Sequence, residues 1–249
     1  MPKTTTLTPP PGYGAIAPLD KQKHSGLGLT PGIGHGWSAR LNAVFVGAAE
    51  MPRAALDFPL AFVRDEGNGE FVPVAILGLK QQQNLYVDGN GRWREHCYIP
   101  AYVRRYPFCL ADIPSPGGHE ARHLICVQED QLAPGQPPLF NAAGEPTAAW
   151  EPMRLLIEAL ETARQQTRAL MRRLEALELL TPFDAIAVPR SGERMRLAGM
   201  YRVDEEKLNL VPGKDLRQLL KRGEMRAVYA HLISLENFAR LMDHALAHG

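Results

Sequence analysis

The sequence predicts an α+β fold, in which an antiparallel, strand-rich N-terminal half is followed by a long helix and a small hairpin-plus-helices C-terminal half packed on it. Three observations lead to this prediction. Short apolar segments joined by tight glycine turns fill residues 38–130. An apolar repeat of helical period runs through residues 152–180. A hairpin pattern and further helical patterns occupy the remainder.

The first segment, residues 1–37, is rich in Pro, Gly and Thr and has few large apolar side chains, which predicts an extended arm. Its glycine-rich part differs from phosphate-binding loops, because no strand precedes it and Pro31 stands where the GxGxxG pattern needs its third glycine. We therefore expect an arm laid over the core and held there by Leu27, Leu29 and Trp37.

Residues 38–130 are expected to form the antiparallel β-rich core. The Asp-Gly and Asn-Gly dipeptides of residues 88–91 supply the positive φ angles that hairpin turns require. A short helical turn bounded by prolines is expected at 52–59. The expected strands cover residues 41–46, 60–64, 71–79, 85–87, 108–113 and 124–127. Residues 131–149, rich in Pro and Gly, form a loop-rich connection with a small hairpin near 141–144.

The long helix is predicted from apolar residues at alternating spacings of four and three. It begins near Pro152, a favoured residue in a first helical turn, and ends at Thr181-Pro182. Its apolar face consists of Leu156, Leu160, Ala163, Thr167, Leu170, Leu174 and Leu177. This face either packs on the chain's own sheet or joins two copies in a homodimer through the 152–180 helix. Thr167 interrupts a repeat of under four heptads, which favours the first reading.

The C-terminal part, residues 150–249, is expected to form one integrated domain with the core. Its features are a hairpin of 183–188 with 195–203, a helix capped by Asp204, a helix at 214–222, and a last helix at 234–247 capped by Ser234.

Composition excludes some classes of function. A net charge of +1 gives no basic footprint for nucleic acid. The N-terminus lacks the apolar region of a signal peptide, and no apolar run reaches the ~18 residues of a membrane-spanning helix. We therefore expect a cytoplasmic protein without a membrane span. The three cysteines, Cys97, Cys109 and Cys126, follow no CxxC spacing and are expected to be reduced thiols.

The segment His119-Glu120-Ala-Arg-His123 matches the HExxH pattern, which places two zinc ligands and a general base on one helical face. A Pro-Gly loop precedes it and a strand pattern follows, so too few residues remain for the required helix. We therefore expect no metal site and no cofactor, and treat a metal-dependent hydrolase as the least favoured alternative.

The better candidate for a binding surface is the aromatic-arginine segment, which combines flat apolar rings with guanidinium groups suited to carboxylate or phosphate. Its candidate ligand-binding residues are Tyr102, Arg104, Arg105 and Tyr106. The competing reading is structural: the two tyrosines pack against Trp93, and the arginines pair with Asp88, Glu95 or Asp112.

The histidines give weaker signals. His231 lies in an apolar stretch, which is typical of a hydrogen-bonded core residue. His24 lies beside Lys21 and Lys23 in the arm and is a candidate partner contact with nothing in the sequence to pair with it. No GxSxG pattern occurs, and no cysteine has a His and Asn at a known catalytic spacing. Catalytic residues therefore stay unassigned.

Several segments together resemble the SapC family of bacterial proteins of about this length. They are the block 42–111, the element Pro18-Leu-Asp-Lys-Gln-Lys-His24, the segment Leu197 to Asn209, and the segment from Gly223 through Ala230-His-Leu-Ile-Ser-Leu235. The resemblance covers roughly residues 15–240. It implies a surface-layer-related protein and supplies no catalytic residues.

The function that we expect from the resemblance is a cytoplasmic binding or accessory protein linked to cell-envelope or surface-layer systems, with a protein or peptide partner. The alternative is an enzyme or peptide-modification accessory that holds a small polar ligand near Tyr102–Tyr106.

Overall fold

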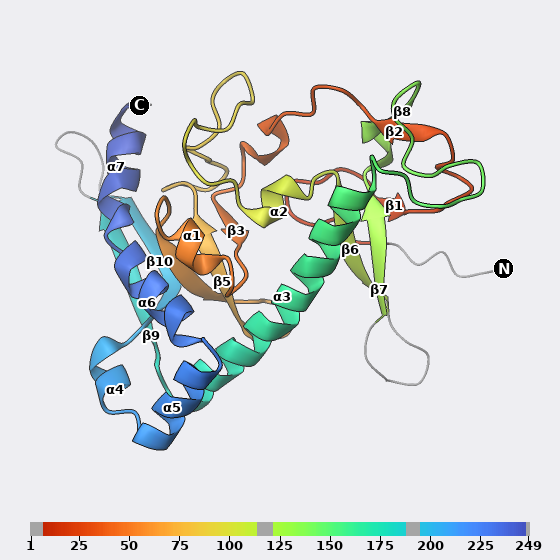
Figure 1. Ribbon diagram of the computed structural model, residues 1–249. Coiled ribbons are helices and arrows are strands. Elements are labelled where there is room, and N and C mark those ends of the chain that lie inside the picture. Colours follow the sequence, from red (N-terminus) through yellow and green to blue (C-terminus); the bar gives the residue numbers. More distant parts are fainter. Residues whose placement is uncertain (1–6, 114–121, 188–194, 248–249) are drawn as a thin grey trace. The chain divides into compact units, whose positions relative to one another are not determined.

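The computed structural model describes residues 7–113, 122–187 and 195–247 (Figure 1). The chain divides into two compact units. Residues 1–37 and 105–159 form the first, and residues 38–104 and 160–249 form the second. Antiparallel sheets and a long helix with shorter helices after it confirm the α+β class.

The first unit contains two small antiparallel sheets. One has the order β1-β7-β6, with β1 at Ala17–Pro18, β6 at Phe108–Ile113 and β7 at Arg122–Val127. The other pairs β2 at Leu27–Leu29 with β8 at Leu132–Pro134. Short 3-10 turns lie at Gly36–Ser38 and Glu129–Gln131. Both sheets draw on the arm, so the arm is built into this unit.

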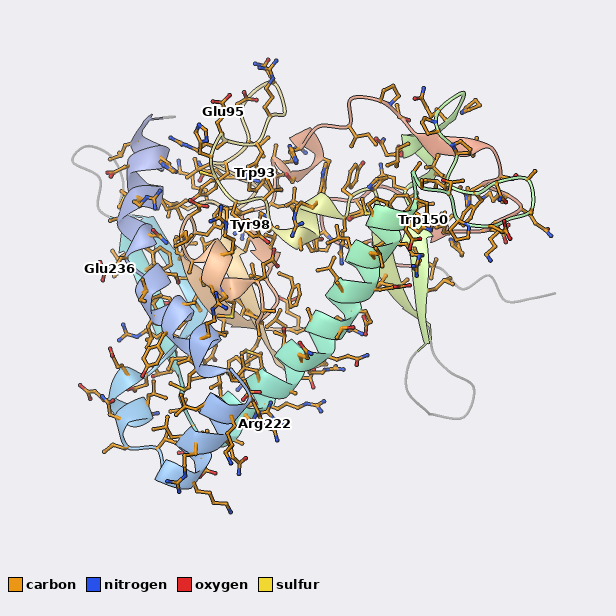
Figure 2. The ribbon with its side chains drawn as sticks, in the orientation of Figure 1. Trp93, Glu95, Tyr98, Trp150, Arg222 and Glu236 are labelled. Atoms are coloured by element: carbon orange, nitrogen blue, oxygen red, sulfur yellow. The ribbon has the colours of Figure 1, made fainter. Side chains whose placement is uncertain are left out.

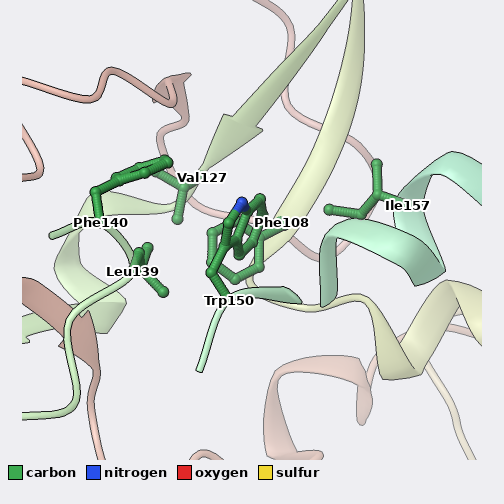
Figure 3. Close-up of a cluster of buried hydrophobic side chains, with 6 residues drawn as sticks. All are labelled: Phe108, Val127, Leu139, Phe140, Trp150 and Ile157. Carbon is green, nitrogen blue, oxygen red and sulfur yellow. The ribbon is translucent and has the colours of Figure 1, made fainter. Parts of the chain in front are cut away.

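A cluster of fully buried side chains fills the first unit (Figure 3). Trp150, just before the long helix, lies 4.5 Å from Phe108 between ring centroids. The cluster consists of Phe108, Val127, Leu139, Phe140, Trp150 and Ile157. Leu29 of the arm packs against it, as do residues from β6, β7 and β8. Burial of this apolar surface explains why the Pro- and Gly-rich 131–149 connection is ordered.

The second unit is built on a five-stranded antiparallel sheet with the order β3-β5-β4-β10-β9. Its strands are β3 Ala43–Phe45, β4 Leu60–Arg64, β5 Phe71–Ile76, β9 Leu180–Ala187 and β10 Met195–Val203. Tyr201 of β10 is registered with Phe62 of β4. The C-terminal hairpin thus extends a sheet that the N-terminal half begins.

The helices are α1 Met51–Ala54, α2 Ala101–Arg104, α3 Glu151–Ala176, α4 Glu205–Asn209, α5 Gly213–Lys221, α6 Met225–Ser234 and α7 Asn237–Ala247. Helix α6 contacts α1 and the strands β4 and β10 (Figure 1). Asp204 caps α4 as predicted, because its side chain accepts a hydrogen bond from the Lys207 N–H at 3.1 Å.

The apolar face of α3 is buried in the second unit from Thr167 to Leu174. Thr167, the residue that interrupts the repeat, accepts a hydrogen bond from the Ala48 N–H and donates one to the Ala163 carbonyl. The helix ends at Ala176, five residues before the predicted stop. Glu178 adopts a φ of 54°, and Thr181-Pro182 belong to β9, where they pair with β10.

The predicted last helix is present as α7, but its predicted start and its predicted cap, Ser234, are wrong. Ser234 ends α6, and its hydroxyl accepts from the Leu60 N–H and donates to the His231 carbonyl. Helix α7 begins at Asn237, whose side-chain amide donates to the carbonyls of Ala55 and Phe58. Ser234 and Asn237, at the junction of the two helices, therefore bond to the sheet and to the residues just after α1.

Candidate functional site

The aromatic-arginine segment falls on both sides of the boundary between the units. Tyr102 and Arg104 lie in α2 of the second unit, where Tyr102 is buried and Arg104 is exposed. Arg105 and Tyr106 belong to the first unit and are half-buried.

Arg104 takes part in a hydrogen-bond network of the second unit. Its Nε donates to the Ile99 carbonyl at 3.0 Å, and its Nη2 donates to the Tyr98 hydroxyl at 3.1 Å. That hydroxyl donates to Glu50 at 2.7 Å, and the same carboxylate accepts from the Ala101 N–H. Burial and the adjacent Glu50 carboxylate raise the pKa of Tyr98 to about 12. The network holds residues 98–104 against the residue that precedes α1.

Tyr106 belongs to an aromatic group of the first unit. Its ring stacks on Trp37 at 4.4 Å between centroids and meets Tyr13 edge-on at 5.1 Å. Arg105 lies over the Tyr13 ring, and the Tyr13 hydroxyl donates to the Phe108 carbonyl. The packing partner of Tyr106 is thus Trp37, where the sequence suggested Trp93.

Trp93 packs elsewhere, in the second unit. It lies near Phe58 and Tyr86, and its indole N–H donates to the Tyr98 carbonyl at 3.0 Å. Asp88 accepts hydrogen bonds from the N–H groups of its own turn.

A cavity of about 550 Å³ in the second unit brings together arginines from three helical segments. Arg173 comes from α3, Arg222 follows α5, and Arg226 lies in the first turn of α6. Gln166 adds a polar amide. The remaining lining residues are Ala48, Ala49, Pro52, Ala169, Leu170, Gly223, Glu224 and Ala227. We call this space the arginine cavity.

Positive charges outnumber negative charges in the lining of the arginine cavity. Its single carboxylate, Glu224, is mostly buried and forms an ion pair with Arg173, with Nε and Oε2 2.9 Å apart. Arg222 and Arg226 are exposed and form no ion pair with any residue of the described chain. Three guanidinium groups and one carboxylate give this lining a net charge of +2.

A second polar cavity of about 530 Å³ lies at the other end of α6. Its charged lining residues are Arg202, Asp204, Glu205, Glu206 and Glu236, which give a net charge of −3. A third, apolar cavity of about 330 Å³ lies between β9, β10 and α7.

The cysteines and His24, considered above as possible reactive or binding side chains, have structural roles in the fold. Burial raises the pKa values of Cys109 and Cys126 to about 11, and burial also raises the pKa of half-buried Cys97. All three are free thiols, as predicted. His24 is buried and bonds through Nε2 to Glu129 at 2.9 Å, which corrects the expectation that nothing pairs with it.

His119 and Glu120 lie outside the described residues. His123 stands in the strand β7, whereas a zinc site of the HExxH type needs a helix. In the described part of the chain, no three His, Cys, Asp or Glu residues are grouped so as to hold a metal ion.

The arginine cavity was missed in the sequence because its residues come from separate helices. The available signal was the run Arg222-Gly-Glu-Met-Arg226, two basic residues around a glycine between two helical patterns.

Comparison with known proteins gives one result. No curated protein and no solved structure matches the chain. Among the helices of the described ranges, none combines the length and the apolar character that crossing a membrane requires. A family model described as SapC matches residues 19–241, nearly the whole chain. The chain therefore belongs to the SapC family.

Proposed function

We propose that this chain is a cytoplasmic binding or accessory protein that acts with cell-envelope or surface-layer systems, and that its arginine cavity holds an acidic segment of a protein or peptide partner. The observation that carries the proposal is the pair Arg222 and Arg226, exposed and without ion-pair partners in the described chain. Membership of the SapC family supports the link to the cell envelope.

The ligand class follows from the charges. Because the single carboxylate of the lining, Glu224, already pairs with Arg173, an incoming carboxylate meets two guanidinium groups that form no ion pair with a described residue. Guanidinium binds carboxylates through parallel N–H donors, so an aspartate or glutamate side chain is a fitting ligand. A volume of about 550 Å³ accommodates one or two side chains of a peptide and leaves the rest of the peptide outside.

A binding role suits the cavity better than catalysis. Among its lining residues, Glu224 is the only carboxylate, and it is already engaged in the ion pair with Arg173. The lining contains no hydroxyl, thiol or imidazole that would act as a nucleophile. These side chains can hold an anionic group, but they supply no reacting atom.

The cytoplasmic location in this proposal is supported by the cysteines. All three are free thiols, although Cys109 and Cys126 are directly opposite each other in the β6–β7 pair. Free thiols are typical of a reducing compartment.

Fluorescence anisotropy with a labelled glutamate-rich peptide tests the proposal, with a glutamine-rich peptide of equal length as the control ligand. The Arg222→Gln, Arg226→Gln variant keeps side-chain length and hydrogen-bonding capacity but removes both charges. We expect its affinity to fall at least about tenfold. The matched control is Arg217→Gln, an exposed arginine of α5 outside the lining. Equal losses in both variants, or no loss in either, would refute the cavity as the binding site.

The alternative, a small polar ligand at the aromatic-arginine segment, is favoured by one observation. Arg104 is exposed, while its hydrogen bonds to Ile99 and Tyr98 fix the guanidinium in place. A fixed guanidinium loses little freedom when it binds an anion.

A further inference from the structure

The outer face of α6 carries a stripe of exposed side chains. Arg226, Tyr229 and Ile233 follow one another at spacings of three and four, so they lie within about 60° of one another around the helix. Tyr229 is 50% and Ile233 69% exposed. On the opposite face, Val228 and His231 are buried, and His231 contacts Phe62 of β4 and Val203 of β10.

The two ends of this helix carry opposite charges. The N-terminal end adjoins the arginine cavity, with a net charge of +2. The C-terminal end adjoins the second polar cavity described above, with a net charge of −3. Figure 2 shows Arg222 and Glu236 near opposite ends of α6. Glu236 is exposed and forms no ion pair with a described residue.

Along the chain, the exposed residues are placed symmetrically about His231, which itself points to the opposite, buried face. Arg226 lies five residues before this point and Glu236 five residues after it, while Tyr229 and Ile233 lie two residues before and after. A second α6 laid antiparallel on this face therefore meets a basic end with an acidic end and an aromatic ring with an aliphatic side chain. A twofold interface requires this self-complementarity.

We propose that two copies of this chain associate through the outer faces of α6, antiparallel about a twofold axis near His231. In this dimer Arg226 pairs with the partner's Glu236, and Tyr229 packs against the partner's Ile233. Arg226 and Glu236, which lies in the turn just after α6, are ten residues apart, or about 15 Å at the helical rise, so the dimer has one charge pair at each end of a small apolar centre.

The small size of the stripe predicts a weak dimer. Interfaces below the standard size are transient, and we expect a dissociation constant on the order of 10–100 µM. Salt weakens the association, because the charge pairs lie at the solvent-exposed rim. Since Arg226 also lines the arginine cavity, the second copy and an acidic peptide compete for it.

Sedimentation equilibrium of the full chain over a concentration series tests the dimer. Ile233→Asp places a charge at the apolar centre and is expected to weaken self-association at least about tenfold. Leu210→Asp is the matched control, because Leu210 is 81% exposed and lies outside the stripe. Circular dichroism of each variant confirms that its exposed substitution leaves the fold unchanged.

The charge pairs provide a sharper test. Arg226→Glu and Glu236→Arg each put like charges face to face and are expected to weaken the dimer. The Arg226→Glu, Glu236→Arg double variant restores opposite charges and is expected to recover the parent's association.

A parent that stays monomeric throughout the series overturns the proposal. The proposal is also overturned if Ile233→Asp leaves the affinity of self-association unchanged. It is overturned too if the double variant associates as weakly as either single variant. Peptide binding is tested independently of these outcomes, because the anisotropy assay uses protein concentrations below the dissociation constant of the dimer.

Discussion

His231 accepts a hydrogen bond at its Nε2 from the main-chain N–H of Val203, at 3.1 Å, in the buried interface between α6 and β10. Burial is the main cause that lowers the pKa of His231, to about 3. The ring therefore stays neutral at physiological pH, which makes this histidine a structural link between helix and sheet, as its apolar surroundings in the sequence predict.

This link predicts an acid-sensitive fold. Below the ordinary pKa of 6.5 the unfolded chain binds a proton at His231 that the folded chain does not, so stability falls as the pH falls from 6.5 toward 3. The expected slope from this group is about 1.4 kcal/mol per pH unit. Urea unfolding of the parent and of His231→Gln, which keeps an acceptor for Val203, measures it. Equal slopes in both proteins would remove His231 as the cause.

The buried face of α3 gives a second prediction. Leu170 is 1% exposed, so Leu170→Asp is expected to lower the free energy of unfolding by more than about 3 kcal/mol. Leu155→Asp on the same helix, where the leucine is 52% exposed, is expected to change it by less than about 1 kcal/mol. Thermal melts compare the two. A Leu170→Asp protein that melts like the parent contradicts the described packing.

Thiol reactivity gives a third prediction. Because burial raises the pKa values of Cys109 and Cys126 to about 11, both are expected to resist alkylation at pH 8 in the folded protein. Half-buried Cys97 is expected to react first, and slowly. Mass spectrometry after iodoacetamide treatment counts the modified sites, with urea-unfolded protein as the control. Rapid labelling of Cys109 in the folded state runs against this expectation.

Several elements could be predicted from local sequence, whereas others depend on distant residues. The strands at 60–64 and 108–113 were predicted with their observed bounds, because segments of the sequence that contain Pro and Gly flank both apolar runs. The end of α6 was missed, since Ser234 ends that helix by bonding to Leu60, which lies 174 residues away. His24 meets Glu129 across 105 residues.

The two candidate sites also differ in how far the local sequence could predict them. The aromatic-arginine segment is contiguous and was visible as a pattern, yet its hydrogen bonds to Glu50 and the stacking of Tyr106 on Trp37 arise only from the fold. The arginine cavity joins α3 to the segment between α5 and α6, and no spacing in the sequence relates Arg173 to Arg226.

The aromatic-arginine segment supplies a fourth prediction. The Arg104→Gln, Arg105→Gln variant is expected to stay folded and to lose binding of inorganic phosphate, because the amides keep hydrogen-bonding capacity but carry no charge. Calorimetric titration in the Arg222→Gln, Arg226→Gln background excludes a contribution from the cavity. Circular dichroism checks the fold. An unfolded variant makes the arginines structural, and unchanged phosphate binding leaves the segment without a binding role.

Binding of an acidic segment in the arginine cavity can be mapped by following amide chemical shifts while the glutamate-rich peptide is titrated into isotope-labelled protein. We expect the largest shifts on residues 222–224, 226 and 227 and on Ala48 and Ala49, which line the cavity together. Shifts confined to residues 98–106, or no saturable shifts in the cavity lining, would contradict it.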